Sequence, residues 1–143
     1  MGANSREQAK AVDFEMLSQF ARQLDQQGKR LKIFRDEIKV PSITGRLKVI
    51  SADTKTNDGY NPSVGIIDEY HAAPNSQMRD VIVSGMGMRR NPLLFVITTA
   101  GFNKEYPCYR LRETCVDILR GVKEDDASFA VIFAMDADDD WKD

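Results

Sequence analysis

The stretch "GIIDEYHAAP", residues 65–74, places a short apolar run directly before two adjacent carboxylates, Asp68 and Glu69. An apolar run of this length between turn-forming residues is typical of a buried strand, so we expect a strand over residues 64–67. Two acids at the end of a buried strand have two interpretations. They are solvated residues at the start of a turn, or they hold a metal ion and a water molecule where a reaction takes place.

Short apolar runs and amphipathic segments alternate along the rest of the chain. The apolar runs predict further strands at residues 31–34, 38–40, 47–51, 93–97 and 130–134, with a hairpin turn at 42–45. Apolar residues at helical spacing predict helices after Ser5, over residues 76–88 and over residues 107–121. This alternation favours an α/β fold with a mostly parallel sheet that helices cover on both faces.

Two of the predicted helices have specific features at their ends. Ser5 and Gln8 have the spacing of an N-terminal capping box, and Gly28 is placed to stop the helix that follows. The predicted apolar face of that helix consists of Val12, Met16, Phe20 and Leu24. Another helix is expected to begin at Pro107 and to end before Gly121. Its predicted buried stripe consists of Leu111, Cys115, Ile118, Leu119 and Val122.

The composition limits the domain organisation. A chain of 143 residues with 42% hydrophobic residues can bury one core of ordinary size, so we expect a single domain or part of one. The sequence has no run of about 18 apolar residues and no signal pattern, which indicates neither a membrane span nor secretion. Cys108 and Cys115 have a spacing that fits neither a CxxC redox pair nor a zinc site, which indicates reduced thiols.

The charge is nearly balanced overall and unevenly distributed along the chain. There are 20 basic and 22 acidic residues, which excludes a basic nucleic-acid footprint over the whole domain. The basic cluster consists of Lys29, Arg30, Lys32, Arg35, Lys39, Arg46 and Lys48. Acidic residues crowd the other end, at Glu124, Asp125, Asp126, Asp136, Asp138, Asp139, Asp140 and Asp143. Both are expected to be solvated faces, and contact with DNA phosphates is the functional alternative for the basic cluster.

Polar residues follow three of the predicted strands, in "DEYH", "TTAG" and "MDADDD". In an open parallel sheet, ligands bind beyond the carboxyl ends of the strands. An acid at such an end can hold Mg²⁺, which prefers hard oxygen ligands and is usually bound through one or two carboxylates. An adjacent glutamate can orient a water molecule and accept its proton during attack on a phosphate.

Four stretches together resemble the large terminase subunit of tailed bacteriophages. They are "ANSREQAKAV", "DGYNPSVGIIDEYHAAP", "MGMRRNPLLFVITTAGF" and "DDDW", in the family's order and spacing over nearly the whole chain. The resemblance implies a P-loop-type ATPase that drives DNA translocation and precedes a metal-dependent nuclease domain. It implies ATP and Mg²⁺ as cofactors. It also implies double-stranded DNA, the small terminase subunit and the portal as partners of a homo-oligomeric ring in the bacterial cytoplasm, with no membrane.

The resemblance also assigns roles to individual positions. Residues 66–69 would be the Walker B segment, with Asp68 as the magnesium-side acid and Glu69 as the catalytic base. Thr98 and Thr99 would open the coupling segment "TTAG", which senses the terminal phosphate of the nucleotide and relays its loss to movement against DNA. Hydroxyl groups suit this task because each can both donate and accept a hydrogen bond.

Arg89 and Arg90 lie just before the strand that leads to the coupling segment. In one interpretation, one of them reaches a phosphate in its own or a neighbouring subunit. In the other, both are surface residues on a turn.

The sequence contains no GxxxxGKS or GxxxxGKT pattern, since "GMGMRR" has glycines without the lysine and the hydroxyl residue. In the resembled family this phosphate-binding loop lies upstream of "ANSREQA" and the nuclease lies downstream of "DDDW". We therefore expect residues 1–143 to be the middle part of an ATPase domain, an incomplete P-loop NTPase core that is inactive alone. Its open sheet edges favour self-association.

Two further features have alternative interpretations. His71 has no partner histidine or cysteine for a catalytic or metal site, and is expected to be a packed or solvent-facing residue next to the site rather than a catalytic one. The acids between Asp136 and Asp140 suit a metal-dependent nuclease or, as we expect, a solvated loop. A non-catalytic interaction fragment that retains only the fold is the third function class.

Overall fold

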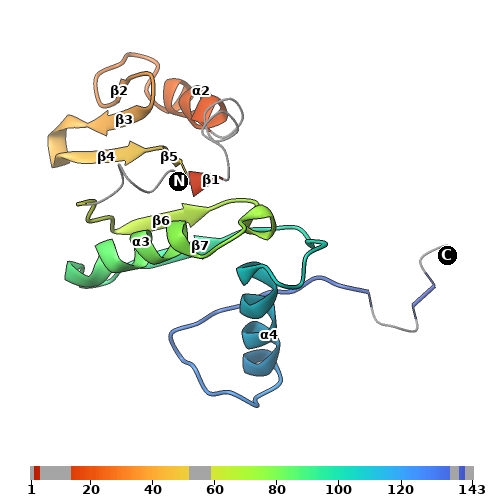
Figure 1. Cartoon of the computed structure of the whole chain (residues 1–143). Coiled ribbons are helices and arrows are strands. Elements are labelled where there is room, and N and C mark those ends of the chain that lie inside the picture. The colour runs from red at the N-terminus through yellow and green to blue at the C-terminus, as the bar shows by residue number, and fades with distance from the viewer. Residues whose placement is uncertain (1, 4–13, 52–58, 136–138, 141–143) are drawn as a thin grey trace.

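The structure, a computed structural model, describes residues 2–3, 14–51, 59–135 and 139–140. The strands are β1 (Gly2–Ala3), β2 (Lys32–Ile33), β3 (Glu37–Val40), β4 (Gly45–Lys48), β5 (Ile50–Ser51), β6 (Val64–Ile67) and β7 (Leu93–Val96). The helices are α2 (Glu15–Leu24), α3 (Gln77–Gly85) and α4 (Pro107–Leu119), with 3₁₀ turns at Pro41–Ile43, Tyr70–Ala72 and Met86–Met88. This mixture of small sheets and helices confirms the predicted α/β class (Figure 1).

The larger sheet has four strands in the order β5-β1-β6-β7, and every pair in it is parallel. The pairing of β6 with β7 sets Val64 opposite Leu93 and Ile67 opposite Val96. The expectation of a parallel sheet is therefore confirmed for these strands. Strand β1 was not predicted, because two residues are too short to show a periodic pattern.

The smaller sheet is antiparallel, with the order β2-β3-β4, and was predicted as a hairpin with one further strand. Ile38 lies opposite both Ile33 and Leu47, so these three side chains share one face. The hairpin turn is the 3₁₀ turn Pro41–Ile43 followed by Thr44, which has a left-handed backbone with φ of 55°. Figure 1 shows this sheet and α2 at one end of the molecule, the parallel sheet in the middle and α4 beyond it.

Helix α2 packs through a different face from the predicted one. Ser18 and Ala21 are buried, whereas Met16, Phe20 and Leu24 are 54%, 55% and 71% exposed. Periodic spacing shows that a helix has an apolar stripe, but it does not determine which stripe the neighbouring sheet covers. The proposed capping box, at residues 5–8, and Val12 lie outside the described residues.

The chain turns sharply after α2, as the sequence predicted from Gly28, whose φ is +62°. The carboxylate of Asp25 accepts hydrogen bonds from the backbone N–H groups of Lys29, Arg30 and Leu31. The bond from Leu31 is the main reason why the pKa of Asp25 lies below its usual value. This loop leads directly into β2.

The buried apolar residues form two clusters, which corrects the expectation of one core. The first lies between α2 and the small sheet and consists of Phe14, Ala21, Ile38 and Val49. The second lies against the parallel sheet and consists of Ile67, Tyr70, Ala73, Met78, Ile82 and Met86. Val49 belongs to the first cluster and the next residue, Ile50, packs against the second, because successive residues of an extended chain point in opposite directions.

Helix α3 packs tightly on the parallel sheet, and its predicted position, at residues 76–88, is confirmed by α3 and the 3₁₀ turn that follows it. Gly65 of β6 allows this approach, because a Cβ atom there would lie only 2.6 Å from Cγ2 of Ile82. A Cβ atom at Gly85, at the end of α3, would likewise clash with the carbonyl oxygen of Tyr60.

Within the described residues, the other face of the parallel sheet has no helix against it, contrary to the prediction that both faces are covered. The side chains of Val64, Leu93, Phe95 and Ile97, which we call the outer sheet face, are 52%, 49%, 47% and 56% exposed. Their neighbours Leu94 and Val96 pack against the second cluster instead. Parallel sheets are normally covered on both faces, so this apolar surface is unusual.

Helix α4 begins at Pro107 and is followed by Gly121 in a left-handed conformation, as the sequence predicted. Its predicted buried stripe is not buried. Leu111 packs partly against the second cluster, whereas Leu119 and Val122 are 55% and 76% exposed. The described contacts of α4 with the second cluster are made by Cys108 and Leu111, in the first half of the helix. No helix of the described residues has the length and apolar character needed to cross a bilayer.

The predicted strand at residues 130–134 is wrong, because this segment is extended but pairs with no described strand. Phe129, Val131 and Phe133 are 92%, 58% and 95% exposed. Alternating apolar residues indicate a preference for extended backbone, and a strand forms only where a neighbour supplies the hydrogen bonds. Figure 1 shows the segment leading away from the two sheets.

Candidate active site

The polar residues that follow β6 and β7 meet at the carboxyl ends of these two parallel strands. Asp68 and Glu69 follow β6, and Thr98 and Thr99 follow β7 after one further residue. The N–H of Ile97 donates to the carbonyl of Ile67 over 2.9 Å, which continues the pairing of the two strands to this edge. The four side chains therefore lie at the carboxyl ends of neighbouring parallel strands, where ligands bind in such sheets.

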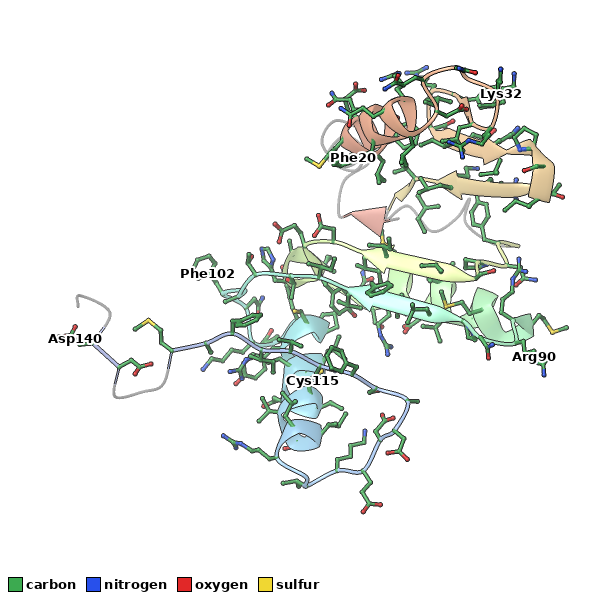
Figure 2. The ribbon with its side chains drawn as sticks, turned by 180° about the vertical axis from the view of Figure 1, so that it is seen from behind. Phe20, Lys32, Arg90, Phe102, Cys115 and Asp140 are labelled. Atoms are coloured by element: carbon green, nitrogen blue, oxygen red, sulfur yellow. The ribbon has the colours of Figure 1, made fainter. Side chains whose placement is uncertain are left out.

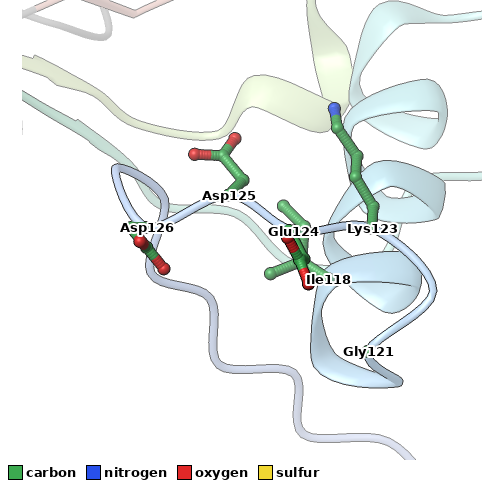
Figure 3. Close-up of a pocket in the computed structure, with 6 residues that line it drawn as sticks. All are labelled: Ile118, Gly121, Lys123, Glu124, Asp125 and Asp126. Atoms are coloured by element: carbon green, nitrogen blue, oxygen red, sulfur yellow. The ribbon is translucent and has the colours of Figure 1, made fainter.

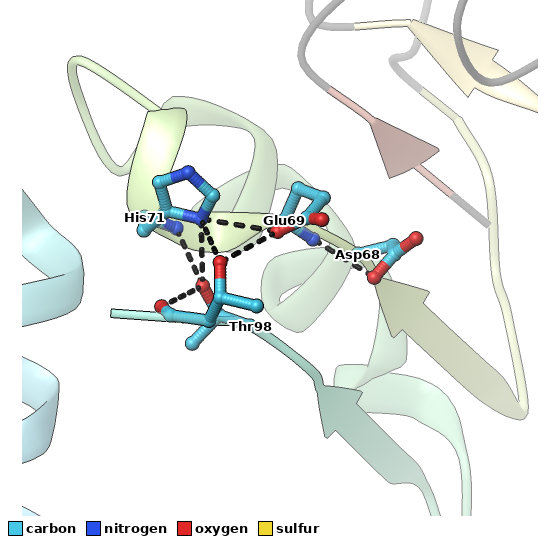
Figure 4. A network of polar contacts seen from close by, with 5 residues as sticks. Asp68, Glu69, His71 and Thr98 are labelled. Atoms are coloured by element: carbon cyan, nitrogen blue, oxygen red, sulfur yellow. Dashed lines mark hydrogen bonds and ion pairs between the residues drawn. The ribbon is translucent and has the colours of Figure 1, made fainter. Parts of the chain in front are cut away.

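A network of polar contacts joins the two segments through His71 (Figure 4). The Nδ1 atom of His71 lies 3.1 Å from Oε2 of Glu69 and 3.1 Å from Oγ1 of Thr98. The backbone N–H of His71 donates to the same Thr98 oxygen over 2.9 Å. The hydroxyl of Thr99 donates to Oε2 of Glu69 over 3.4 Å. Glu69 is thus connected to the "TTAG" segment both directly and through the imidazole ring.

The backbone at Glu69 has an unusual conformation. Glu69 has a left-handed conformation, with φ of 50° and ψ of 45°, which is unfavourable for a residue with a Cβ atom. Its N–H donates to Oδ1 of Asp68 over 2.9 Å, and the 3₁₀ turn that follows places Tyr70 in the second cluster, 2% exposed. Residues in such conformations persist where the surroundings fix them, and they are concentrated at functional sites.

Sequence reasoning placed His71 next to the site without a catalytic role, and the structure brings it into contact with Glu69 and Thr98. A Cβ atom at Gly101 would lie 2.9 Å from Cβ of His71, so the glycine of "TTAG" makes room for the histidine. The sequence contains a weak signal of this contact, namely a glycine, Gly101, two residues after Thr99. That signal becomes informative only when the strand pairing is known.

Arg89 and Arg90 lie at the opposite end of the parallel strands, before the amino end of β7. They precede β7, whereas Thr98 follows it, and Figure 2 shows Arg90 and Phe102 at opposite ends of this strand. The guanidinium of Arg89 donates to the carbonyl of Asn61 over 3.0 and 2.6 Å. Within the described residues of one chain, neither arginine is brought to Asp68 and Glu69.

Asp68 is the candidate magnesium ligand of this site. Among the described residues there is no group of three or more acidic, histidine or cysteine side chains that could hold a metal ion. Asp68 is a partly buried carboxylate at the strand end. One or two carboxylates are the usual protein contribution to Mg²⁺, with water and phosphate oxygens as the other ligands. Asp68 alone meets that requirement.

Of the acids between Asp136 and Asp140, the structure describes two. Asp136 and Asp138 lie outside the described residues, and Asp139 and Asp140 are exposed. Figure 2 shows Asp140 on the tail, away from both sheets.

A second acidic group lies in a surface hollow that follows α4 (Figure 3). Its lining residues are Ile118, Gly121, Lys123, Glu124, Asp125 and Asp126. The carboxylate of Asp125 accepts hydrogen bonds from the N–H of Ala127, over 3.0 Å, and from the hydroxyl of Ser128, over 2.9 Å. The bond from Ser128 is the main reason why the pKa of Asp125 is lowered. These contacts describe a solvated turn.

The small sheet aligns three basic residues on its exposed face. Lys39 of β3 lies directly opposite Lys32 of β2 and Arg46 of β4, and all three are exposed. We call this set the basic row. The carboxylate of Glu37 pairs with this row, 2.9 Å from Nζ of Lys39. Like charges directly opposite one another destabilise a sheet, so this arrangement costs some stability.

The chain is similar to terminase proteins in sequence and in fold. The sequence model of the family described as terminase large subunit, ATPase domain, matches residues 1–116. Protein YmfN of Escherichia coli (strain K12) is 39% identical over 89 residues, which are 62% of this chain and 20% of YmfN. The crystal structure of the HK97 bacteriophage large terminase matches with a TM-score of 0.68 at 27% identity, over 85% of this chain and 25% of that chain. This chain therefore spans a quarter or less of each relative.

Proposed function

Because the chain belongs to the family of terminase large subunit ATPase domains, we propose that it supplies the Walker B and coupling segments of an ATP-hydrolysing motor that packages double-stranded DNA. The observation that carries this proposal is the meeting of Glu69 with Thr98 and Thr99 at the carboxyl edge of the parallel sheet. A carboxylate beside hydroxyl groups at this edge suits the attack of water on a phosphate.

In the proposed reaction, Glu69 orients a water molecule and accepts its proton while the water oxygen bonds to the γ-phosphorus of ATP. The bond between that phosphorus and the bridging oxygen breaks, and ADP and phosphate are the products. Asp68 would hold Mg²⁺, which neutralises charge on the phosphate oxygens when it is bound. The partly buried position of both acids keeps the carboxylates close to the sheet rather than in bulk solvent.

The two threonines are the proposed sensor of the terminal phosphate. In the structure the hydroxyl of Thr98 donates to the carbonyl of Thr99 over 2.9 Å, and that of Thr99 donates to Glu69. Each hydroxyl can exchange this acceptor for a phosphate oxygen at little cost, because one hydrogen bond replaces another. Loss of the phosphate would return the segment to the arrangement seen here and move the chain that follows it.

The chain is proposed to act as one part of a longer machine. The phosphate-binding loop that its sequence lacks would come from an upstream segment and the nuclease from a downstream one, with the small terminase subunit and the portal as partners. The motor would be a homo-oligomeric ring in the cytoplasm of the bacterial host. In such a ring, Arg89 or Arg90, at the opposite edge of the sheet, would act on the nucleotide of a neighbouring subunit.

The basic row is the proposed DNA contact. Residues 29–48 contain seven basic and two acidic residues, which leaves 13 basic and 20 acidic residues in the rest of the chain. The positive charge is therefore concentrated on one small sheet of an otherwise acidic protein. Contacts of lysine and arginine with phosphates are independent of base sequence, as a packaging motor requires.

The central experiment separates ATP hydrolysis from DNA cleavage. In a full-length large terminase subunit that contains this segment, Glu69→Gln and Asp68→Ala are expected to lower ATP turnover by roughly 10²-fold or more and to leave DNA cleavage intact. Alanine at Asp138, Asp139 and Asp140 serves as the comparison. Loss of cleavage in that variant would favour the nuclease alternative, and normal ATP turnover in the Glu69→Gln variant would refute the proposed function.

A further inference from the structure

The only histidine of the chain lies at the centre of the polar network, and the proposed reaction assigns it no step. We propose that His71 is a positioning residue that holds the carboxylate of Glu69 against the coupling segment. Its effect on hydrolysis rests on the proposed function, whereas the contact itself does not.

The hydrogen-bond partners determine which ring atom of His71 carries a proton. Oε2 of Glu69 is a carboxylate oxygen and only accepts. The single hydrogen of the Thr98 hydroxyl is directed to the carbonyl of Thr99, so toward the ring this hydroxyl also accepts. Nδ1 of His71 lies 3.1 Å from both oxygens, and 3.4 Å from the hydroxyl of Thr99, whose hydrogen is directed to Glu69. A hydrogen on Nδ1 therefore gives the two nearer oxygens their donor. The inference holds for the neutral ring and for the charged ring, because both can carry a hydrogen on Nδ1.

The ring is itself fixed on the side of the coupling segment. The backbone N–H of His71 donates to Thr98, and Gly101 packs against its Cβ atom. On the other side, the adjacent residue Tyr70 is almost fully buried in the second cluster. The imidazole ring thus contacts residues that follow both β6 and β7. The side chain of His71 is only 26% exposed.

Through these contacts, His71 restrains the orientation of the Glu69 carboxylate. Glu69 needs a defined orientation to accept a proton from water, and its left-handed backbone alone does not fix its carboxylate. The donor at Nδ1 supplies that restraint. Because the same ring contacts Thr98, any change of hydrogen bonding at the threonines on phosphate binding or release is passed to the carboxylate. His71 therefore couples the sensor to the base.

The contact can be tested directly on this chain by ¹⁵N NMR of the imidazole ring. Since the chain has one histidine, its ring signals need no assignment by mutation. We expect Nδ1 to carry the proton in the folded protein at neutral pH, and Glu69→Ala to shift the Nδ1 signal. A wild-type ring that carries its proton only on Nε2 would overturn the inference, and this measurement requires no variant to fold.

The role in hydrolysis is tested by two substitutions in a full-length subunit that contains this segment. In His71→Asn the side-chain amide nitrogen takes the place of Nδ1, whereas in His71→Gln it takes the place of Nε2. We expect His71→Gln to lower kcat by roughly ten-fold or more with little change in KM, because this variant loses one hydrogen bond to a charged group. We expect His71→Asn to retain most of the activity.

Equal kcat values for the two variants, or a change in KM alone, would overturn the positioning role. The ¹⁵N signal of the His71 ring distinguishes a failure of the positioning role from a failure of the proposed function. If ATP turnover does not depend on Glu69 at all, the proposed function fails while the Nδ1 contact is still measured independently.

Discussion

Ile67 of β6 lies directly opposite Val96 of β7 in a parallel pair, and this single pairing brings Glu69 within 3.4 Å of Thr99, 30 residues later in the chain. Parallel strands have their carboxyl ends at the same edge, so residues that follow both strands become neighbours. A shift of the register by one residue would turn alternate side chains to the opposite face and would separate the acid from the hydroxyl groups.

The chain on its own is expected to show no ATP turnover above background. It has no phosphate-binding loop in its sequence, so the backbone amides and the lysine that hold the β- and γ-phosphates are missing from the proposed site. A coupled assay of phosphate release measures this, with the Glu69→Gln variant as the control. Turnover that disappears in that variant would show that the prediction is wrong.

Gly65→Ala is expected to lower the free energy of unfolding by about 1–3 kcal/mol, the usual cost of overpacking. The new Cβ atom would lie 2.6 Å from Cγ2 of Ile82, a branched side chain that cannot swing aside. Gly87→Ala is the matched control, since a Cβ atom there meets nothing within 4 Å. Its effect should stay within about 0.5 kcal/mol in urea denaturation. Equal losses in both variants would contradict the packing argument.

Stability is expected to decrease at alkaline pH because of Tyr70. Burial raises the pKa of its hydroxyl, so the unfolded chain releases this proton at a lower pH than the folded protein. Below a pH of about 10 the hydroxyl is protonated in both states and stability is unaffected, and above it unfolding becomes progressively easier. Tyr70→Phe should remove this part of the pH dependence.

Tyr109→Phe is the control for this measurement, because Tyr109 is only partly buried. Burial also raises the pKa of the Cys108 thiol, which is present in both variants and contributes equally. Chemical denaturation at a series of pH values from 8 to about 11 gives the two curves. If the free energy of unfolding depends on pH in the same way for Tyr70→Phe and for wild type, Tyr70 does not cause the loss of stability at alkaline pH.

Removing charge from the basic row is expected to weaken binding to double-stranded DNA regardless of base sequence. Each of Lys32→Gln, Lys39→Gln and Arg46→Gln should reduce the slope of log K against log salt by about 0.9 for each phosphate that the variant no longer neutralises. Arg112→Gln and Arg120→Gln, on exposed positions of α4 and just after it, are the charge-matched controls. If these two variants bind DNA as weakly as the variants of the basic row, the small sheet is not the contact surface.

The outer sheet face is expected to make the isolated chain self-associate. Phe95 lies on this apolar surface, 47% exposed, so Phe95→Ser should move the population toward the monomer. Phe102→Ser is the control, because Phe102 is fully exposed and lies outside the outer sheet face. Light scattering after size-exclusion chromatography measures the mass. A wild-type chain that is strictly monomeric and unfolds cooperatively would speak against this prediction.

The local elements were largely predictable. Strands β6 and β7, helix α3 and helix α4 were expected from apolar runs, from spacing, and from Pro107 and Gly121 at the helix ends. The predictions for residues 130–134 and for the apolar face of α2 failed for one reason. Periodicity describes what a segment prefers by itself, whereas pairing and burial depend on a neighbour that the segment does not contain.

The sequence by itself determined where the strands lie and that Asp68, Glu69 and the "TTAG" segment stand at strand ends, because these are properties of neighbouring residues. Only the tertiary structure decided that His71 joins Glu69 to Thr98, that Arg89 and Arg90 lie at the far edge, and that the basic row is aligned. Those relationships depend on strand direction and register. Both are set by contacts between residues far apart in the chain, which no local pattern contains.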